Sequence, residues 1–276
     1  MPDADVMTVS HLAVWGDPIA HSKSPALHSA AYAVLGLDWE YGRRQVSAPD
    51  FSSAIDALDA SWRGLSLTMP LKEEAFRAAA TRDRHAEISG AVNTLLLGAE
   101  PAGFNTDVGG IVDALAENGV TAVETVRILG AGATAASALL AAHELGATRA
   151  DVRARRPERA AGLVTLGESL GVRITTGLLD APAERVDLTL ATLPSGTDLD
   201  ASVAARLADD GGALFDAAYA PWPSALAAVW GERPVISGLG MLLHQAVRQI
   251  RIFHHGDPRE PLPDEGRVLA AMRAAL

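Results

Sequence analysis

The stretch "TVRILGAGATAASALLAAHELGATRADVRARR", residues 125–156, decides the fold of the region around it. A short apolar run leads into a glycine-rich turn, and an alanine-rich segment then leads into a second short run that ends in arginines. Strand, turn, helix and strand within about 30 residues form one βαβ unit, whose two strands belong to one parallel sheet. The stretch therefore predicts an α/β domain.

The turn "GAGATA" places Gly130, Gly132 and Ala135 in a GxGxxA pattern. The first glycine permits the tight turn, the second lets the backbone approach a pyrophosphate, and the small third residue lets the helix pack closely on the strand. The helix N-terminus adds N–H groups and a positive partial charge. An ordinary strand–helix turn is the alternative, but the βαβ context favours a Rossmann-like dinucleotide site.

The second strand of this unit ends in "ARRPER", which contains Arg155, Arg156 and Arg159 and has no carboxylate before Glu158. NAD sites usually have an acidic residue here for the ribose hydroxyls, whereas arginine accommodates the 2′-phosphate of NADP. The segment therefore favours NADP as the cofactor. A solvated basic turn is the alternative, and it would leave NAD possible.

The first hundred residues also alternate between strand and helix patterns, and a chain of 276 residues is long enough for two domains. We expect strands at 12–16, 39–46, 64–69 and 91–97, and helices at 24–37, 48–60 and 70–82. This order favours a second α/β layer structure. Two C-terminal helices, at 240–256 and 265–276, could fold back on either domain.

Composition excludes several classes of function. The chain has no cysteine, which excludes disulfides and thiolate chemistry, and its eight histidines form no HExxH pair, so we expect no metal site. The net charge of −11 argues against nonspecific binding to nucleic acid or anionic membranes. No apolar run reaches the roughly 18 residues of a membrane span, and no secretion signal begins the sequence, so we expect a soluble cytoplasmic protein.

Polar side chains follow several of the expected strands. Thr68 and Lys72 lie where "LTMPLKEE" passes from an apolar strand into a helix, and Asn93 and Asp107 follow short apolar strands. Ligands gather at the carboxyl edge of the strands in open α/β sheets, so we expect these residues near that edge. Lys72 is one of only two lysines and can exchange a proton where arginine cannot. Each residue alone could instead be a cap or turn residue.

The segment "IAHSKSP", residues 19–25, combines helix-start signals with two hydroxyl groups. Ser24 is expected to be the N-cap of a helix that Pro25 opens, and Ser22 adds a second hydroxyl. A helix N-terminus with two hydroxyl groups suits a carboxylate. The segment therefore predicts a pocket for a carboxylate at the start of a helix, and Lys23 is the residue that we least expect to contact the ligand.

Seven short motifs occur in order along the chain. They are "GDPIAHSKSPALH" (16–28), "LTMPLKEE" (67–74), "GAVNT" (90–94), "NTD" (105–107), "GAG" (130–132), "DAAY" (216–219) and "GLGMLLHQA" (238–246). On these motifs the chain resembles the shikimate dehydrogenases. The resemblance implies an enzyme that reduces 3-dehydroshikimate to shikimate with NADPH, on the route to chorismate and the aromatic amino acids. It also implies a substrate-binding domain at 1–105, a Rossmann-like NADP-binding domain at 106–236, and C-terminal helices at 237–276 that pack back on the first domain.

The resemblance assigns roles to individual residues. It implies that Ser22 and Ser24 hold the substrate carboxylate and that Lys72 and Asp107 form the proton-handling pair. The remaining residues around the substrate ring would be Thr68, Asn93, Tyr219 and Gln245. The implied NADP contacts are Gly130, Ala131, Gly132, Ala133, Thr134, Arg155, Arg156, Arg159, Thr192 and Gly238.

Several positions depart from the pattern of the family. Ser66 stands where an asparagine is usual, so we expect one polar contact to be shorter or water-mediated. Ala133, Ala154 and Ser237 depart on the cofactor side and make the cofactor preference the less secure inference. A quinate/shikimate dehydrogenase that tolerates NAD and a non-catalytic shikimate-binding sensor remain alternatives. The expected partner is a small molecule, and the chain could be a monomer or a homodimer.

Overall fold

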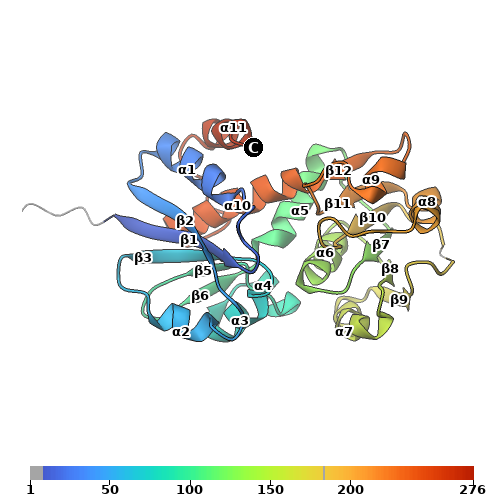
Figure 1. Ribbon diagram of the computed structural model, residues 1–276, viewed down its shortest axis with the longest axis horizontal. Coiled ribbons are helices and arrows are strands. Elements are labelled where there is room, and N and C mark those ends of the chain that lie inside the picture. The colour runs from blue at the N-terminus through green and yellow to red at the C-terminus, as the bar shows by residue number, and fades with distance from the viewer. Residues whose placement is uncertain (1–8, 183) are drawn as a thin grey trace, which may run out of the picture. The chain divides into compact units, whose positions relative to one another are not determined.

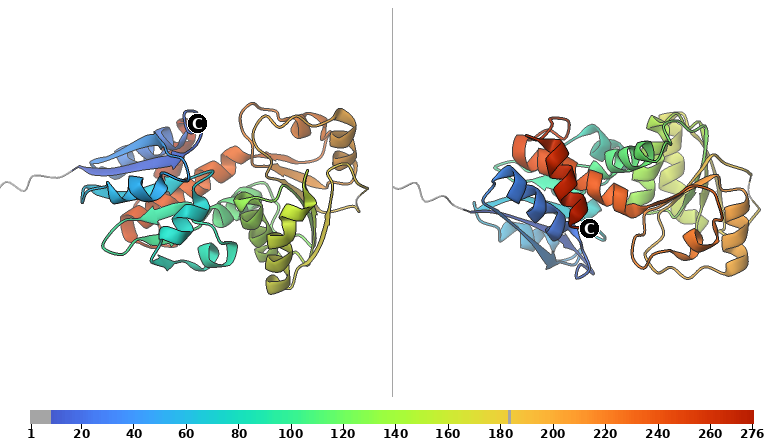
Figure 2. Two further views of the ribbon diagram at one scale, coloured as in Figure 1. Left: turned by 60° about the horizontal axis from the view of Figure 1, so that its bottom comes forward. Right: turned by 90° about the horizontal axis from the view of Figure 1, so that it is seen from above.

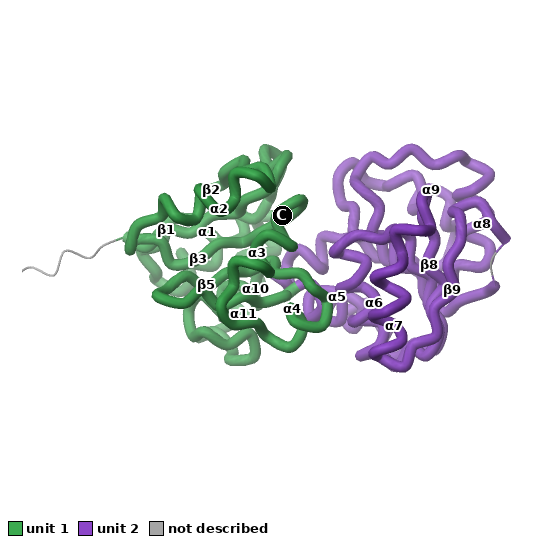
Figure 3. The backbone as a smooth tube through the Cα atoms, turned by 90° about the horizontal axis from the view of Figure 1, so that it is seen from below, with its two compact units in different colours: residues 1–106, 246–276 green, residues 107–245 purple. Residues whose placement is uncertain are grey.

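The computed structural model describes residues 9–182 and 184–276, and these form two compact α/β units (Figure 3). Unit 1 contains the chain up to Thr106 together with Ala246–Leu276, and unit 2 contains Asp107–Gln245. The chain therefore returns to unit 1 at Ala246, inside a helix, whereas the sequence analysis placed the start of the returning segment at 237.

The sheet of unit 1 has six strands among the described residues, in the order β2-β1-β3-β5-β6-β4. The strands are β1 (Ser10–Gly16), β2 (Trp39–Gln45), β3 (Trp62–Leu67), β4 (Thr81–Arg82), β5 (Thr94–Leu96) and β6 (Ala102–Phe104). The pairs β1/β2, β1/β3 and β4/β6 are parallel, and β5 runs antiparallel to β3 and β6. The expected mostly parallel sheet is confirmed, but β4 occupies the end of a segment that was expected to be helical.

Helices cover both faces of this sheet (Figure 1). They are α1 (Ser24–Leu35), α2 (Phe51–Asp56), α3 (Lys72–Ala78) and α4 (Arg84–Ser89), with the C-terminal part of α10 (Gly238–His255), and α11 (Glu265–Ala274) packs against α1. On one face α2 and α3 pack on a core that includes Trp15, Leu65 and Leu67. On the other face the Phe253 ring of α10 lies against Gly64, where a side chain on the strand would leave no room for the ring.

Unit 2 contains a fully parallel sheet, with the order β12-β11-β10-β7-β8-β9 in the described chain. The strands are β7 (Thr125–Leu129), β8 (Arg149–Arg153), β9 (Arg173–Gly177), β10 (Leu188–Ala191), β11 (Ala213–Asp216) and β12 (Val235–Ser237). The order reverses between β7 and β10, which is the switch point of a doubly wound fold. The predicted Rossmann-like domain is therefore present.

The helices of unit 2 follow from this winding. They are α5 (Thr106–Glu117), α6 (Ala133–Glu144), α7 (Ala161–Leu170), α8 (Ala201–Asp209) and α9 (Ala225–Val229), with a 3₁₀ turn at Pro157–Ala160. Right-handed crossovers place α6 and α7 on one face of the sheet and α8 and α9 on the other, as Figure 2 shows. None of the helices in the described residues is long and apolar enough to cross a membrane.

Candidate active site

Thr68 and Lys72 lie at the carboxyl edge of the unit 1 sheet. The Thr68 N–H donates to the carbonyl of Trp15 at 3.0 Å, so the chain continues the pairing of β1 and β3 before it turns. Lys72 is the first residue of α3 and is half-buried, and its backbone carbonyl accepts a hydrogen bond from the Val92 N–H at 3.0 Å. The structure thus places Lys72 at the expected edge, in the first turn of the expected helix.

Asn93 reaches the same edge by a route that the sequence did not predict. We expected it to follow a strand, but it precedes β5, which runs antiparallel to β3 with Thr94 opposite Ser66. The amino end of an antiparallel strand lies beside the carboxyl end of its neighbour. The Asn93 carbonyl therefore accepts the Leu67 N–H at 2.7 Å, beside the start of the Lys72 segment.

Thr106 ends unit 1 next to Asn93. β6 is antiparallel to β5, with Phe104 opposite Thr94, so the chain leaves β6 at this same edge. The Asn93 Oδ1 accepts the Thr106 N–H at 2.9 Å, and the Asn93 Nδ2 donates to the Thr106 hydroxyl at 2.9 Å. Asp107 is the next residue, in the first turn of α5, and it is buried.

The expectation that Ser24 caps the first helix is wrong. The N-cap position is Lys23, and α1 begins at Ser24 itself. The Lys23 carbonyl accepts the N–H groups of Ala26 and Leu27, at 3.1 and 3.3 Å, which are the donors that a Ser24 cap would have bound. The Ser22 hydroxyl instead accepts the Ser24 N–H at 3.3 Å, so the hydroxyl oxygen at the helix start belongs to Ser22.

The side chain of Lys23 points away from the two serines on either side of it in the chain. Its Nζ donates to the carbonyl of Leu276, at the end of the chain, at 2.9 Å. The ammonium group therefore fixes the C-terminus beside α1, which already packs against α11.

The nucleotide turn of unit 2 lies between the carboxyl ends of β7 and β10. The Gly130 N–H donates to the Arg153 carbonyl at 2.8 Å, and Gly130 has φ +117°, a conformation that favours glycine. The Thr192 hydroxyl donates to the Leu129 carbonyl at 2.9 Å, which brings Thr192 against this turn. Ala131 lies between the two glycines of the turn, and Ala133 and Thr134 begin α6.

The turn fits a pyrophosphate. Apart from Gly132 itself and its two neighbours in the chain, no described residue has an atom within 4 Å of a Cβ position on Gly132, so the backbone there is open to an approaching group. Gly132 is also the N-cap of α6, whose first N–H groups are available to an anion. Ala135 is fully buried, as the third position of the GxGxxA pattern requires.

Arg155, Arg156 and Arg159 lie in the turn that follows β8, and all three are exposed. Their guanidinium groups form no ion pair or hydrogen bond with the described part of the chain, so they can meet a phosphate. The neighbouring Arg153 differs because it is buried and donates to both carboxylate oxygens of Asp151 at 2.8 Å. The basic charge of this edge therefore comes from the three residues that the sequence singled out.

Tyr219 belongs to a loop that Asp216 ties down. The Asp216 carboxylate is 3% exposed and accepts hydrogen bonds from the Ala218 N–H at 3.0 Å and the Ser224 hydroxyl at 2.5 Å. Burial raises the pKa of Asp216, and burial also raises the pKa of Tyr219. Asp216 belongs to the motif "DAAY", which was the available signal, but its role in holding this loop was not predicted from the sequence.

Gly238 and Gln245 lie on α10. A Cβ on Gly238 would collide with the Ala217 carbonyl, so only a glycine at this position lets α10 approach the backbone of the same loop this closely. Gln245 is 8% exposed, and its Nε2 donates to the Leu242 carbonyl at 2.9 Å. A cavity of about 390 Å³ lies between the segments 193–199 and 216–226, at the carboxyl ends of β10 and β11.

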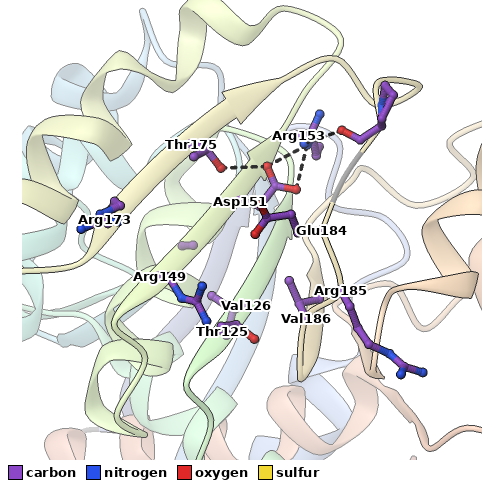
Figure 4. Close-up of a pocket in the computed structure, with 12 residues that line it drawn as sticks. Thr125, Val126, Arg149, Asp151, Arg153, Arg173, Thr175, Glu184, Arg185 and Val186 are labelled. Atoms are coloured by element: carbon purple, nitrogen blue, oxygen red, sulfur yellow. Dashed lines mark hydrogen bonds and ion pairs between the residues drawn. The ribbon is translucent and has the colours of Figure 1, made fainter.

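A second cavity, of about 610 Å³, lies away from this edge (Figure 4). Its lining includes Thr125, Arg149 and Arg173, which are the first residues of β7, β8 and β9. The amino ends of parallel strands lie at the edge opposite to the nucleotide turn, so this cavity is separate from that turn. Asp151 lies in this cavity between Arg153 and Thr175. The Thr175 hydroxyl donates to the Asp151 carboxylate at 3.1 Å.

No group of three or more potential metal-ligating side chains occurs in residues 9–182 and 184–276.

Comparison with known proteins identifies the family. Residues 14–95 match the family described as "Shikimate dehydrogenase substrate binding domain". The chain is 35% identical over 282 residues to the "Shikimate dehydrogenase (NADP(+))" of Xanthomonas euvesicatoria, with 97% of each chain covered. The chain belongs to the shikimate dehydrogenase family. A second relative with that name, from Methanothermobacter thermautotrophicus, is 34% identical, with 89% of this chain and 91% of the relative covered.

Solved structures of shikimate dehydrogenases share the fold over nearly the whole length of the chain. The crystal structure of the Mycobacterium tuberculosis shikimate dehydrogenase is 38% identical, with a TM-score of 0.81, and the match covers 96% of this chain and 99% of that one. The Thermus thermophilus shikimate 5-dehydrogenase, solved in complex with NADP(H) and shikimate, is 30% identical with a TM-score of 0.80 and covers 97% and 100%.

Proposed function

We propose that this protein is an NADP-dependent shikimate dehydrogenase that interconverts 3-dehydroshikimate and shikimate. The observation that carries the proposal is the gathering of Thr68, Lys72 and Asn93 at one edge of the unit 1 sheet, in a chain that also has a nucleotide turn. Family relatives named for this NADP-dependent activity, and a relative solved with both NADP(H) and shikimate, support it. Unit 1 would then bind the substrate and unit 2 the cofactor.

The reaction needs a proton for the oxygen of the reduced carbonyl. When bound, NADPH supplies the hydride that is added to the carbonyl carbon. Lys72 donates a proton to the oxygen as negative charge develops there, and Asp107 orients the ammonium group and accepts a hydrogen bond from a neighbouring hydroxyl. In the oxidation of shikimate the same pair accepts the proton.

Ser22 and Ser24 would hold the substrate carboxylate. Because the Ser22 oxygen accepts the Ser24 N–H, its own hydrogen remains to donate to a carboxylate oxygen. The start of α1 adds a positive partial charge at the same place. Thr68, Asn93, Tyr219 and Gln245 supply the remaining polar contacts to the ring and its hydroxyls.

The cofactor would bind along the carboxyl edge of unit 2. Gly130 to Thr134 would hold the pyrophosphate, and the exposed guanidinium groups of Arg155, Arg156 and Arg159 would hold the 2′-phosphate. Thr192 and Gly238 border the other half of the edge. This charge distribution favours NADP over NAD.

Steady-state kinetics with shikimate and quinate, each with NADP and with NAD, test the proposal. We expect the highest kcat/KM for shikimate with NADP. A comparable value for quinate or for NAD would indicate a quinate/shikimate dehydrogenase. If the protein binds shikimate but reduces no NADP even at high enzyme concentration, the proposed enzyme function is wrong and a sensor function is supported.

A further inference from the structure

A buried glutamine of α10 lies directly beneath the candidate substrate site. Gln249 is 2% exposed, and all the hydrogen-bonding groups of its amide are used inside unit 1. Its Nε2 donates to the Asn93 carbonyl at 3.2 Å and to the Thr94 hydroxyl at 3.1 Å. Its Oε1 accepts from the Ser66 hydroxyl at 2.8 Å and lies 3.3 Å from the His28 Nε2.

These bonds have only one direction. The Asn93 carbonyl can only accept, so Gln249 must present its Nε2 there and its Oε1 to Ser66 and His28. The His28 Nε2 therefore carries the ring hydrogen, and the Nδ1 accepts from the Tyr32 hydroxyl at 3.0 Å. Burial lowers the pKa of His28 to about 3 against the opposing effect of the Gln249 bond, so the ring is neutral near pH 7.

The network continues from Gln249 to the Asn93 side chain. The Thr94 hydroxyl, which accepts from Gln249, donates to the Asn93 Oδ1 at 2.9 Å. Gln249 therefore holds Asn93 twice, directly at its backbone carbonyl and through Thr94 at its amide oxygen. Oδ1 is fixed by Thr94 and by the Thr106 N–H, and Nδ2 donates to the Thr106 hydroxyl at 2.9 Å. The orientation of the amide is thereby set, with Nδ2 as its donor side.

Ser66 takes part in the network instead of in the substrate site. From the sequence we expected the contact at Ser66 to be a shorter or water-mediated version of the usual asparagine contact. Its hydroxyl is 3% exposed, donates to Gln249 and accepts from the Tyr41 hydroxyl at 2.6 Å. The hydroxyl hydrogen is thus used inside unit 1, and Ser66 has none left to donate to a substrate.

We propose that Gln249 is a positioning residue for substrate binding. Acting through the Asn93 carbonyl and the Thr94 hydroxyl, it sets the orientation in which the Asn93 amide donates to the substrate. The inference rests on the proposed function, because it concerns the same site. It adds a residue outside the resemblance motifs, on the helix that returns from unit 2 to unit 1.

Two variants, each with only a small change in side-chain size, test whether Gln249 positions Asn93 or only stabilises the fold of unit 1. Gln249→Met keeps the length of the side chain but removes both bonds that hold Asn93. Tyr41→Phe removes one bond of the same network, to Ser66, and leaves both links to Asn93 in place. Melting temperature, kcat, and KM for shikimate and for NADP are measured for both variants and for the native protein.

We expect both variants to lower the melting temperature, because each leaves a buried partner without its hydrogen bond. Only Gln249→Met should raise KM for shikimate, by about tenfold or more, with KM for NADP unchanged. Thr94→Val, which cuts the link to the Asn93 Oδ1, should give the same split if Gln249→Met fails to fold.

The inference is overturned if Gln249→Met, or Thr94→Val in its place, leaves KM for shikimate at the value of Tyr41→Phe. It is also overturned if KM for NADP rises in parallel, since a general loss of structure would do that. A native protein that does not oxidise shikimate would instead overturn the proposed function, so the two failures are distinguishable.

Discussion

Alanine at Gly130 or at Gly132 adds the same methyl group to the same turn, yet the two variants should fail in different ways. Gly130 has φ +117°, and a Cβ there would lie 2.6 Å from the Thr192 hydroxyl oxygen. Gly132 has φ −103° and ψ −171°, which any residue adopts, and no described residue beyond its two chain neighbours has an atom within 4 Å of its Cβ position. The first change should therefore damage the fold, and the second should damage only the cofactor site.

The size of the first effect follows from two costs. An alanine held in an unfavourable backbone region costs about 1–3 kcal/mol. Moving Thr192 aside breaks its 2.9 Å bond to the Leu129 carbonyl, which costs about 1 kcal/mol more. The total of about 2–4 kcal/mol should lower the melting temperature by roughly 7–13 °C in a unit of about 140 residues.

The assay combines thermal unfolding with kinetics. Gly130→Ala should show the lower melting temperature without any ligand. Gly132→Ala should unfold within about 2 °C of the native protein, but its methyl group would stand where the pyrophosphate approaches, so KM for NADP should rise about tenfold or more. The reasoning is refuted if Gly132→Ala lowers the melting temperature as much as Gly130→Ala does, or if it leaves KM for NADP unchanged.

Three more outcomes can be checked. Lys72→Ala should lower kcat by about 10²–10⁴-fold with little change in shikimate binding, whereas Ser22→Ala and Ser24→Ala should mainly raise KM for shikimate; steady-state kinetics separate the two patterns. Asp151→Asn removes the carboxylate that two buried arginines share and should cost about 3–5 kcal/mol in the free energy of unfolding, measured with denaturant. Burial lowers the pKa of His28 to about 3, so as the pH falls the unfolded chain takes up the proton on this histidine before the folded protein does. The free energy of unfolding should therefore decrease as the pH is lowered from 6.5 to 3, by up to about 1.4 kcal/mol per pH unit. Denaturant unfolding at several pH values should show less of this pH dependence for His28→Gln.

The nucleotide half could be predicted from the sequence because its signal is local. A strand, two glycines and an alanine-rich helix are adjacent in the chain, and the turn and the helix start form within that segment. The three arginines after β8 follow the same logic, since a turn at the surface leaves them exposed whatever the rest of the chain does.

The substrate half was less predictable. β4 and β6 have two and three residues, which is too few to show the alternation of apolar and polar residues typical of a strand. They are recognised as strands only because β4 pairs with β6 and β6 pairs with β5. Asn93 was expected at the edge of the sheet for the wrong reason, because nothing in "GAVNT" indicates that the following strand is antiparallel. Serine is a residue type typical of the N-cap, but the Lys23 carbonyl accepts the N–H groups that the Ser24 hydroxyl would bind as a cap.

The sequence by itself determined the α/β class, the dinucleotide turn and the residue types for the proposed chemistry, because these depend on neighbours along the chain. Only the tertiary structure decided which strands meet at the edge that carries Lys72 and Asn93. It also decided that Ser66 serves a buried network centred on Gln249, whose partners lie more than 150 residues away. Hydrogen bonds of that kind depend on how a C-terminal helix packs against a sheet, and no local pattern in the sequence records that packing.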